Sequence, residues 1–471
     1  MNDLSYSDWM KFQKSFFRFE SFENLANDTI LFFTKSRWPN GEPSRVLLLS
    51  KQEVDAFSQM HLGDRVIENK FGYTSYRDLL EKLRSELKQE SRYDFVLVDF
   101  RQLIKSERDF AIFREEIGEE MSEILRAIVV PRRYLGLLTD FPGPSSTAYP
   151  IPWFLAVLLR KKLRLRDEKV GLCDFNGKVY YLLLLQSKDD RRVPYYSRIQ
   201  TAPYPHDVPA WVFVKSPPRK KNEIYHPAKF PEALVQRFIG IFTRRGDLVF
   251  DPMVGTGSSL IAAARMDRKA VGIDIVEEFV DIAKERLSRE VLTQLDEWVY
   301  GKNKRPQIEV LKGDATRLLD DSRLTDRVFD YCITSPPYWS VLRNRGSEYQ
   351  KSRRTKKLPQ FYSQEERDLG NIDDYDKFLD VLSSVYNQVA NLLKPQGHLT
   401  VILKNVKRNH VVYPIAWDLS MRLCGKSGEY DYSGNTLWCQ DDIKIRPFAL
   451  GIHWVSNTLH NYCLHFGRRG T

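Results

Sequence analysis

The chain has 471 residues, a net charge of +10 and 42% hydrophobic residues. It is longer than one typical domain, so we expect two or three, and its hydrophobic content excludes a disordered protein. The positive charge favours a polyanionic partner such as a nucleic acid, although on charge alone a basic protein without such a partner is an equal alternative.

The cysteines and the ends of the chain bear on compartment. None of the five cysteines belongs to a C-x-x-C pair or a Cys/His cluster, so we expect no disulfide framework and no metal site. The N-terminus lacks the charged and apolar regions of a signal peptide. The longest apolar run, residues 179–185, is too short to span a bilayer. These features predict a cytoplasmic protein with reduced thiols and no membrane partner.

Strand-like runs alternate with amphipathic stretches along the chain, which is typical of an α/β fold. Residues 1–205 are expected to form a first domain and residues 226–471 a second. A linker is expected at 206–225, where two prolines precede three basic residues. The predicted strands are 45–50, 93–100 and 135–138 in the first domain, and 247–251, 269–274, 308–314, 329–334 and 399–403 in the second.

A glycine-containing turn, residues 251–258 (Asp-Pro-Met-Val-Gly-Thr-Gly-Ser), joins a strand to a predicted helix at 258–266. Glycines let the backbone approach a ligand, and a helix N-terminus offers free N–H groups. A tight structural turn is the usual explanation of G-x-G alone. Here Asp274 ends the next strand and can accept from ribose hydroxyls, while Asp314 ends a third and can accept from an adenine amino group. A predicted helix at 276–297 separates these two strands.

The most specific motif is Thr-Ser335-Pro336-Pro337-Tyr338-Trp, which follows a buried strand. The two prolines stiffen the backbone and leave carbonyls without N–H donors. The Ser335 hydroxyl and the Pro336 carbonyl can accept the two hydrogens of an amino group and aim its nitrogen at an electrophilic methyl. Tyr338 offers a flat face to a base rotated out of a duplex. A proline-stiffened loop packed in the core is the alternative.

With these motifs the chain resembles the DNA amino-methyltransferases, whose catalytic motif is (D/N/S)-P-P-Y/F. In that family the serine form is associated mainly with N4 of cytosine, and the acidic and amide forms with N6 of adenine. Residues 226–232 (His-Pro-Ala-Lys-Phe-Pro-Glu) resemble the family's motif over the methionine end of the cofactor, and residues 393–397 resemble a later one. The resemblance covers about 226–410. Met253 departs from the usual Phe, and the cofactor half precedes the catalytic half, whereas many Ser-Pro-Pro-Tyr enzymes have the reverse order.

The resemblance implies a Rossmann-like class I methyltransferase domain that uses S-adenosylmethionine. Catalysis is expected from Ser335, Pro336, Pro337 and Tyr338. The implied cofactor contacts are Phe230, Pro231, Glu232, Asp251, Pro252, Gly255, Gly257, Ser258, Asp274 and Asp314.

A basic stretch at about 343–367 looks like an insertion and holds eight Arg and Lys residues against three acids. Its cations can hold DNA phosphates while Tyr349, Phe361 or Tyr362 supports an opened base stack. A solvated charged insertion is the alternative. The DNA-binding candidates are Arg343, Arg345, Arg353, Arg354, Lys356 and Lys357.

The first half repeats the second weakly. The pairs of similar segments are 93–100 with 329–336, 149–153 with 413–417, and less clearly 45–50 with 269–274. The first copy has neither the glycine turn nor Ser-Pro-Pro-Tyr. We therefore hypothesise that residues 1–205 form a degenerate methyltransferase-like α/β domain that serves DNA binding or acts as a silent subunit. Chance similarity between α/β segments is the alternative.

The function implied is in-line methyl transfer from S-adenosylmethionine to N4 of cytosine in double-stranded DNA, within a restriction-modification or defence system and without a covalent enzyme intermediate. N6 of adenine, or an amino group of RNA, would keep the fold and change the target. A DNA-binding subunit of a methyltransferase complex is the non-enzyme alternative. The sequence leaves open whether the chain acts with a partner subunit or as a homodimer.

Overall fold

The computed structural model describes residues 4, 9–10, 12–51, 62–141, 150–173, 178–187, 197–203, 205, 207–215, 230–291, 307–339, 365, 367–408, 411–441, 456 and 458–470. The chain divides into two compact units. The first comprises residues 1–196, 407–413 and 442–460, and the second comprises 197–406, 414–441 and 461–471. Among the helices of the described residues, none is long and apolar enough to cross a membrane.

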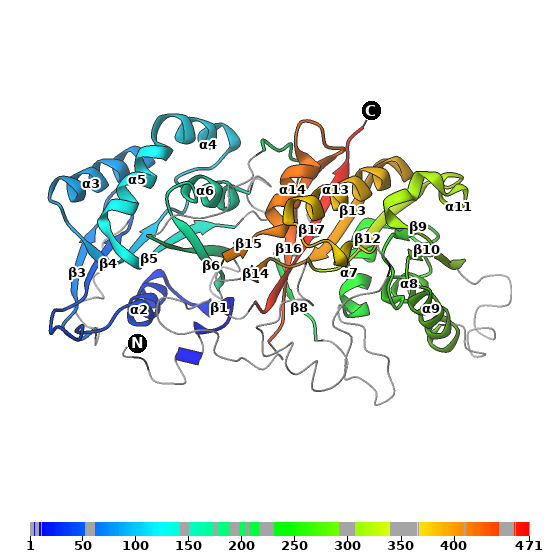
Figure 1. Cartoon of the computed structure of the whole chain (residues 1–471), viewed down its shortest axis with the longest axis horizontal. Helices are drawn as coiled ribbons and strands as arrows, with labels where there is room; N and C mark the ends of the chain where they lie inside the picture. The colour runs from blue at the N-terminus through cyan, green and yellow to red at the C-terminus, as the bar shows by residue number, and fades with distance from the viewer. Residues whose placement is uncertain are drawn as a thin grey trace. The chain divides into compact units, whose positions relative to one another are not determined.

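The second unit is built on an eight-stranded sheet in the order β11-β10-β9-β12-β13-β17-β16-β8 (Figure 1). Strands β11 to β13 are parallel to one another, and β17 is antiparallel to β13. The first five strands thus follow the doubly wound 3-2-1-4-5 order, which confirms the predicted Rossmann-like fold. The strands are β8 (Trp211–Phe213), β9 (Leu248–Asp251), β10 (Lys269–Asp274), β11 (Ile308–Lys312), β12 (Phe329–Thr334), β13 (Leu393–Leu403), β16 (Tyr430–Cys439) and β17 (His460–Arg468).

Helices connect these strands and bury their apolar faces on the sheet. Gly257 precedes α8 with φ +83°, and a Cβ there would lie 3.0 Å from the Cβ of Ala283 on α9, so a glycine lets the two helices approach. The helix predicted at 276–297 is present as α9, which begins at Glu277 and ends at Glu290. The helices are α7 (Glu232–Phe242), α8 (Ser258–Ala264), α9 (Glu277–Glu290), α11 (Ser322–Thr325), α13 (Tyr375–Leu392) and α14 (Ile415–Cys424), with short 3-10 turns at Ala315–Asp320 and Leu369–Asn371.

The first unit has a seven-stranded sheet in the order β1-β6-β7-β5-β4-β2-β3. Its strands are β1 (Phe16–Phe19), β2 (Arg45–Leu49), β3 (Val66–Lys70), β4 (Tyr93–Asp99), β5 (Val129–Asp140), β6 (Arg164–Cys173) and β7 (Val179–Gln186). Its helices are α2 (Phe22–Phe33), α3 (Tyr76–Lys88), α4 (Glu107–Phe113), α5 (Glu119–Ile128) and α6 (Ile151–Leu159), with a π-helical turn at Arg114–Gly118.

The two sheets share one topology. From β3 to β1, the strands of the first unit take the places of β10, β9, β12, β13, β17, β16 and β8 in turn. In each unit the edge strand before the first helix, β1 or β8, is parallel to its neighbour. The last strand of the parallel set, β5 or β13, is followed by an antiparallel strand. Within the described residues the first unit has no counterpart of β11. The repeat seen weakly in the sequence is therefore a repeat of the fold.

A buried arginine clamp recurs in both units. In the first, Arg65 donates to the hydroxyl of Thr34 (2.7 Å) and to its carbonyl (3.0 Å) at the end of α2. In the second, Arg268 donates to the hydroxyl of Thr243 (3.0 Å) and to its carbonyl (2.8 Å) at the end of α7. Each clamp ties the first helix to the residue that precedes β3 or β10, so it fixes the same corner of both folds.

Two further details repeat. The Asp94 carboxylate accepts from the Arg45 N–H at 3.0 Å, and the Asp330 carboxylate accepts from the Leu248 N–H at 2.8 Å. Helices α6 and α14 each follow a proline of nearly identical conformation, with φ/ψ −82°/66° at Pro150 and −84°/68° at Pro414. The Asp contacts make β2 the counterpart of β9. The match of 45–50 with 269–274 was therefore wrong by one strand, because a short apolar run does not indicate which strand of the sheet it forms.

The segment expected as a linker, 206–225, contains β8, which pairs in parallel with β16. A strand of three residues is too short to show alternation, and the prolines and charges around it dominate the composition. The later segments 407–413 and 442–460 belong to the first unit, and no feature of the sequence predicted that assignment.

The two clamps predict matched stability effects. Arg65→Met and Arg268→Met should each lower the free energy of unfolding by about 1–3 kcal/mol, because each leaves buried acceptors without donors. Urea unfolding followed by amide hydrogen exchange would assign each loss to its own unit. Arg245→Met, an exposed cation paired with Asp267, is the control and should cost little. Loss of protection in the same unit for both clamp variants would contradict the repeat.

Candidate functional site

A pocket lies at the carboxyl edge of the second unit's sheet, where the turns after β9, β10, β11 and β12 meet. It encloses about 590 Å³ of space, including its open mouth, which is within the range for small-molecule sites. Three of the predicted site residues, Asp274, Asp314 and Ser335, line it. Its walls are Pro252, Met253, Gly255, Asp274, Ile275, Val276, Phe279, Asp314, Ala315, Ser335, Pro337, Arg367, Asp368 and Leu369.

The glycine turn is bound to the end of β10 by a carboxylate. Gly255, at φ +50°, donates its N–H to Asp274 Oδ2 at 2.8 Å, and the Val276 N–H donates to Oδ1 at 3.0 Å. A carboxylate has about four acceptor sites, so Asp274 keeps acceptors for a ligand. Burial raises the pKa of Asp274 to about 6, although the two N–H donors oppose that shift.

Asp251 lies beneath the turn rather than on the pocket wall. It is fully buried and accepts from the Ser259 hydroxyl at 2.5 Å and from the Met253 N–H at 3.1 Å. Burial raises the pKa of Asp251 to about 6, and the Ser259 hydroxyl partly offsets that rise. Asp251 therefore shapes the turn from inside.

Asp314 has one oxygen committed to its own turn. Its Oδ1 accepts from the N–H and the hydroxyl of Thr316 at 2.8 and 2.7 Å. Its Oδ2 is 3.5 Å from the guanidinium of Arg367. The second oxygen faces the pocket side and can still accept from a ligand amino group.

The Ser-Pro-Pro-Tyr segment leaves β12 with its serine hydroxyl unsatisfied. Ser335 Oγ is buried and, within the described residues, makes no hydrogen bond of normal geometry, although the Tyr338 hydroxyl lies nearby. Burial raises the pKa of Tyr338 to about 12. Trp339 anchors the end of the segment by donating its indole N–H to the Asp373 carbonyl at 3.0 Å. A buried hydroxyl without a partner is costly, so this one is suited to a ligand group.

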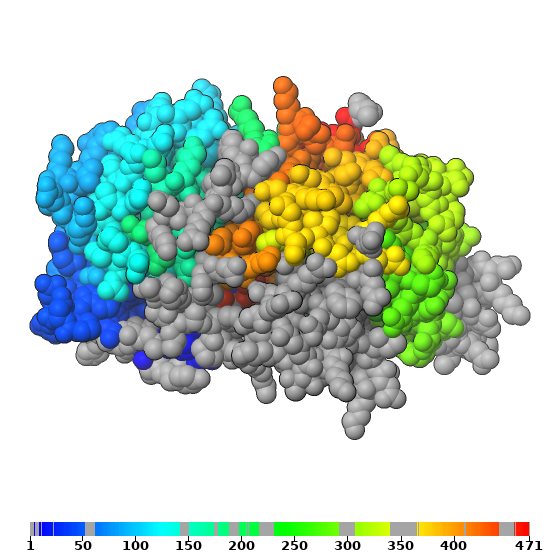
Figure 2. Space-filling view, in the orientation of Figure 1, coloured from blue at the N-terminus to red at the C-terminus, as the bar shows by residue number. Residues whose placement is uncertain are grey.

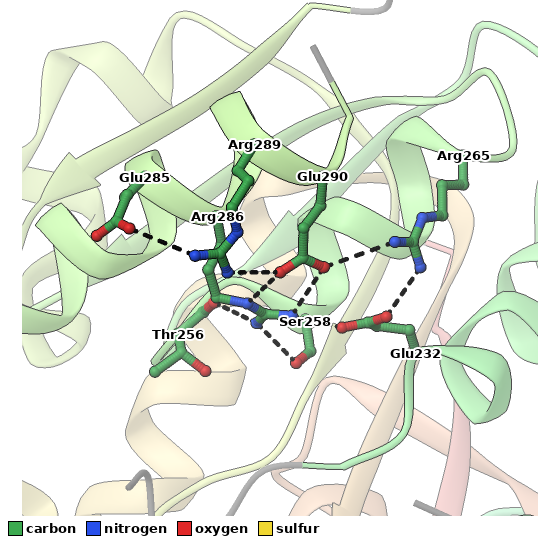
Figure 3. A network of polar contacts seen from close by, with 8 residues as sticks. All are labelled: Glu232, Thr256, Ser258, Arg265, Glu285, Arg286, Arg289 and Glu290. Atoms are coloured by element: carbon green, nitrogen blue, oxygen red, sulfur yellow. Dashed lines mark hydrogen bonds and ion pairs between the residues drawn. The ribbon is translucent and has the colours of Figure 1, made fainter. Parts of the chain in front are cut away.

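A buried ion network holds the glycine turn from the other side (Figure 3). Arg286 of α9, 4% exposed, donates to the Thr256 carbonyl between the two glycines at 2.6 Å. The same guanidinium contacts Glu232 at 2.5 Å and Glu290 at 3.1 Å. Arg265 completes the network by contacting Glu232 at 2.9 Å. The turn, α7 and α9 are thereby locked together.

Several expected cofactor contacts lie behind the pocket wall. Phe230 is part of the hydrophobic core, and Pro231 caps α7. Glu232 is engaged by the two arginines. Ser258 starts α8 and lies 3.4 Å from the Arg286 guanidinium, and Gly257 supports the packing of α8 on α9. These residues form the scaffold of the wall.

The sequence analysis missed several wall residues, among them Phe279, Asp368 and Leu369. Phe279 lies in the first turn of α9, where an aromatic residue looks like part of a core face. Asp368 and Leu369 follow the basic stretch, and no periodicity or motif marks them. All three come to the pocket only through the folding of distant segments onto one edge.

The six DNA-binding candidates, Arg343 to Lys357, lie outside the described residues, as do 226–229 of the upstream motif. In the part of the chain that is described, no group of three or more His, Cys, Asp or Glu residues is arranged to hold a metal ion.

At the equivalent edge of the first unit, the residue in the place of Ser335 is paired within its own unit. Phe95 and Tyr331 occupy matching register positions beside β5 and β13, so Asp99 stands where Ser335 stands. Arg101 binds both oxygens of Asp99, at 2.8 and 2.7 Å. A carboxylate neutralised in this way has little capacity left for an incoming amino group.

The network predicts a local loss of order when Arg286 is removed. Arg286→Met removes a cation that pairs with the Glu232 and Glu290 carboxylates. The free energy of unfolding should therefore fall by about 3–5 kcal/mol, and amide exchange at 255–258 should become faster. Lys312→Met, which removes an exposed ion pair with Glu277 outside the network, should leave both unchanged. Equal exchange in both variants would show that Arg286 does not hold the turn.

Comparison with known proteins gives the family. The chain matches the family model N6_N4_Mtase, described as DNA methylase, over residues 1–285, more than half of its 471 residues. It is 36% identical over 104 residues to the type II methyltransferase M.HpaI of Haemophilus parainfluenzae, covering 22% of this chain and 33% of that protein. It is 42% identical over 89 residues to the orphan methyltransferase M.BamHII of Bacillus amyloliquefaciens, covering 19% and 33%.

The chain thus spans about a third of the length of these two relatives. Among solved structures, a 16S rRNA methyltransferase of T. thermophilus shares 14% identity over 91% of this chain and 89% of its own, with a TM-score of 0.27. The family assignment depends on the 1–285 match. On that match, the chain belongs to the N6/N4 DNA methylase family.

Proposed function

We propose that this protein is an S-adenosylmethionine-dependent DNA methyltransferase that modifies N4 of cytosine. The observation that carries the proposal is the unsatisfied Ser335 hydroxyl on the wall of the same pocket as Asp274. One group is an acceptor for an amino substrate, and the other is an acceptor for a ribose. The catalytic domain would be 226–471, in a cytoplasmic enzyme of a restriction-modification or defence system.

The wall residues fit the cofactor chemically. Asp274 would accept from the ribose hydroxyls and Asp314 from the adenine amino group, while Gly255 keeps the turn free of side chains. Bound there, S-adenosylmethionine would supply an electrophilic methyl group. The cost of burying Asp274 would be offset by hydrogen bonds that a ligand donates to it.

The chain's own contribution to catalysis is orientation and electrostatics. The Ser335 hydroxyl and the Pro336 carbonyl would accept the two hydrogens of the base's amino group, which stabilises the positive charge that develops on its nitrogen. Tyr338 would stack on the flipped base and hold it in line with the methyl. The proposal needs no metal and no covalent intermediate.

Serine at position 335 is what favours N4 of cytosine over N6 of adenine in this proposal. The basic residues Arg343, Arg345, Arg353, Arg354, Lys356 and Lys357 would hold the phosphates of double-stranded DNA. The first unit would have no catalytic activity, because the Arg101 guanidinium already pairs with the Asp99 carboxylate.

The direct test is methyl transfer from labelled S-adenosylmethionine to duplex DNA of mixed sequence, followed by mass spectrometry of the nucleosides. We expect N4-methylcytosine. Ser335→Ala and Tyr338→Ala should each reduce transfer by at least about 100-fold, with cofactor affinity unchanged in calorimetry. Leu319→Ala, an exposed site on the same unit, is the control. N6-methyladenine would change the assigned base, and full activity of both variants would overturn the assigned site.

The raised pKa of Asp274 predicts a pH dependence of cofactor binding. Protonation removes an acceptor, so affinity for S-adenosylmethionine should fall as the pH drops through about 6. Asp274→Asn should bind S-adenosylmethionine at least about tenfold more weakly at pH 8, and its affinity should vary less with pH. This smaller variation separates the titration of Asp274 from that of Asp251. Calorimetry between pH 5 and 8 measures both.

The same group predicts a trend in stability. The pKa of Asp274 is higher in the folded protein, about 6, than its ordinary value of 3.8. Its contribution is therefore most favourable below pH 4 and is lost as the pH rises through 6. The stability of Asp274→Asn relative to the wild type should increase over that interval. If the difference in the free energy of unfolding between the two proteins stays constant over that interval, a group other than Asp274 titrates there.

A further inference from the structure

Lys404 follows directly after β13 at the functional edge of the second unit. Strand β13 pairs with β12 up to Val401 opposite Thr334, so Lys404 lies just beyond the end of the ladder, beside the segment that carries Ser335. Its ammonium is 5.4 Å from the centroid of the Tyr338 ring. Lys404 therefore contacts the ring that is proposed to stack on the target base.

Within the described residues this half-buried ammonium has no hydrogen-bond or ion-pair partner, and burial alone lowers the pKa of Lys404. Two partly buried lysines on either side of it in the sequence are paired. Lys394, at the other end of β13, contacts Asp330 at 2.8 Å, and Lys407 contacts Asp167 in the first unit. A cation without a hydrogen-bond or ion-pair partner is costly to bury, so this ammonium is suited to acceptors that a ligand supplies.

The repeated fold gives an independent comparison. Tyr134 of β5 and His398 of β13 hold matching register positions beside Phe95 and Tyr331. Counting six residues on from each, Lys404 corresponds to Asp140. Asp140 accepts from the Gln102 N–H at 2.5 Å and has the opposite charge. The fold therefore does not require a lysine at this position, and the lysine occurs in the unit whose edge carries the described pocket.

We propose that Lys404 is a specificity-determining residue that binds the target base, donating to the acceptors beside the amino group on its Watson–Crick edge. This inference rests on the proposed function of the same site. In cytosine those acceptors are N3 and O2, whereas adenine offers only N1 beside a C–H group. A flexible side chain with three donors can serve both cytosine acceptors, so Lys404 favours cytosine. Its contact with Tyr338 places the ammonium against the ring on which the base is proposed to stack.

The test uses the full-length protein and the variants Lys404→Met and Lys404→Arg, with Lys394→Met as a matched control from the same strand. Three quantities are measured: transfer to duplex DNA of mixed sequence with nucleoside analysis, affinity for S-adenosylmethionine, and the unfolding temperature. A pair of hydrogen bonds to a base edge discriminates by about 1–3 kcal/mol, so kcat/KM for DNA should fall by about 10- to 100-fold in Lys404→Met.

Stability separates this role from a structural one. Lys404→Met should keep its cofactor affinity and unfold at the same or a higher temperature, because an unpaired cation has been removed. Lys404→Arg should recover part of the lost activity, since it keeps a donor. Lys394→Met should keep wild-type kcat/KM and unfold at a slightly lower temperature, because it loses an ion pair.

The outcomes are distinguishable. A wild type that transfers no methyl group to DNA would overturn the proposed function itself. An active wild type with an equally active Lys404→Met would overturn only the inference about Lys404. A Lys404→Met protein that unfolds earlier and loses cofactor affinity would assign Lys404 to the scaffold, which also overturns it.

Discussion

The hydrogen bond from the Gly255 N–H to the Asp274 carboxylate joins the two strand ends on which the pocket depends. It requires a backbone at φ +50° on one side and a buried carboxylate on the other. Arg286 holds the same turn through the Thr256 carbonyl and ties it to α7 through Glu232. The wall of the pocket is therefore rigid before any ligand arrives, which lowers the entropy cost of binding.

Polar groups of the scaffold and of the proposed site differ in whether the second unit itself supplies their hydrogen-bond partners. Scaffold groups such as Asp251, Arg268 and Arg286 are satisfied within the unit. Ser335 and Lys404, at the edge of the sheet, lack hydrogen-bond partners among the described residues. A folded chain usually satisfies its buried polar groups. Ser335 lies on the wall of the pocket, where a ligand can supply the missing partner.

The first unit has the same fold but different residues at the positions of Ser335 and Lys404. Its clamp of Arg65 on Thr34 and its Asp94 contact are preserved, since they stabilise the fold. At the positions of Ser335 and Lys404 it carries Asp99 and Asp140, and each of these accepts from a neighbouring group of its own unit. A duplicated fold can thus keep its structural interactions while the residues at this edge change and find partners within their own unit.

The sequence by itself determined the local features: the α/β class, the strands around the glycine turn, and the Ser-Pro-Pro-Tyr segment. These are encoded in short-range patterns of apolar residues, glycine and proline. Only the tertiary structure decided that Glu232 and Ser258 support the wall, that Phe279 and Asp368 line it, and that β2 corresponds to β9. It also joined 407–413 and 442–460 to the first unit. Such facts depend on which distant segments pack together, and side-chain periodicity along one element carries no information about its neighbour in space.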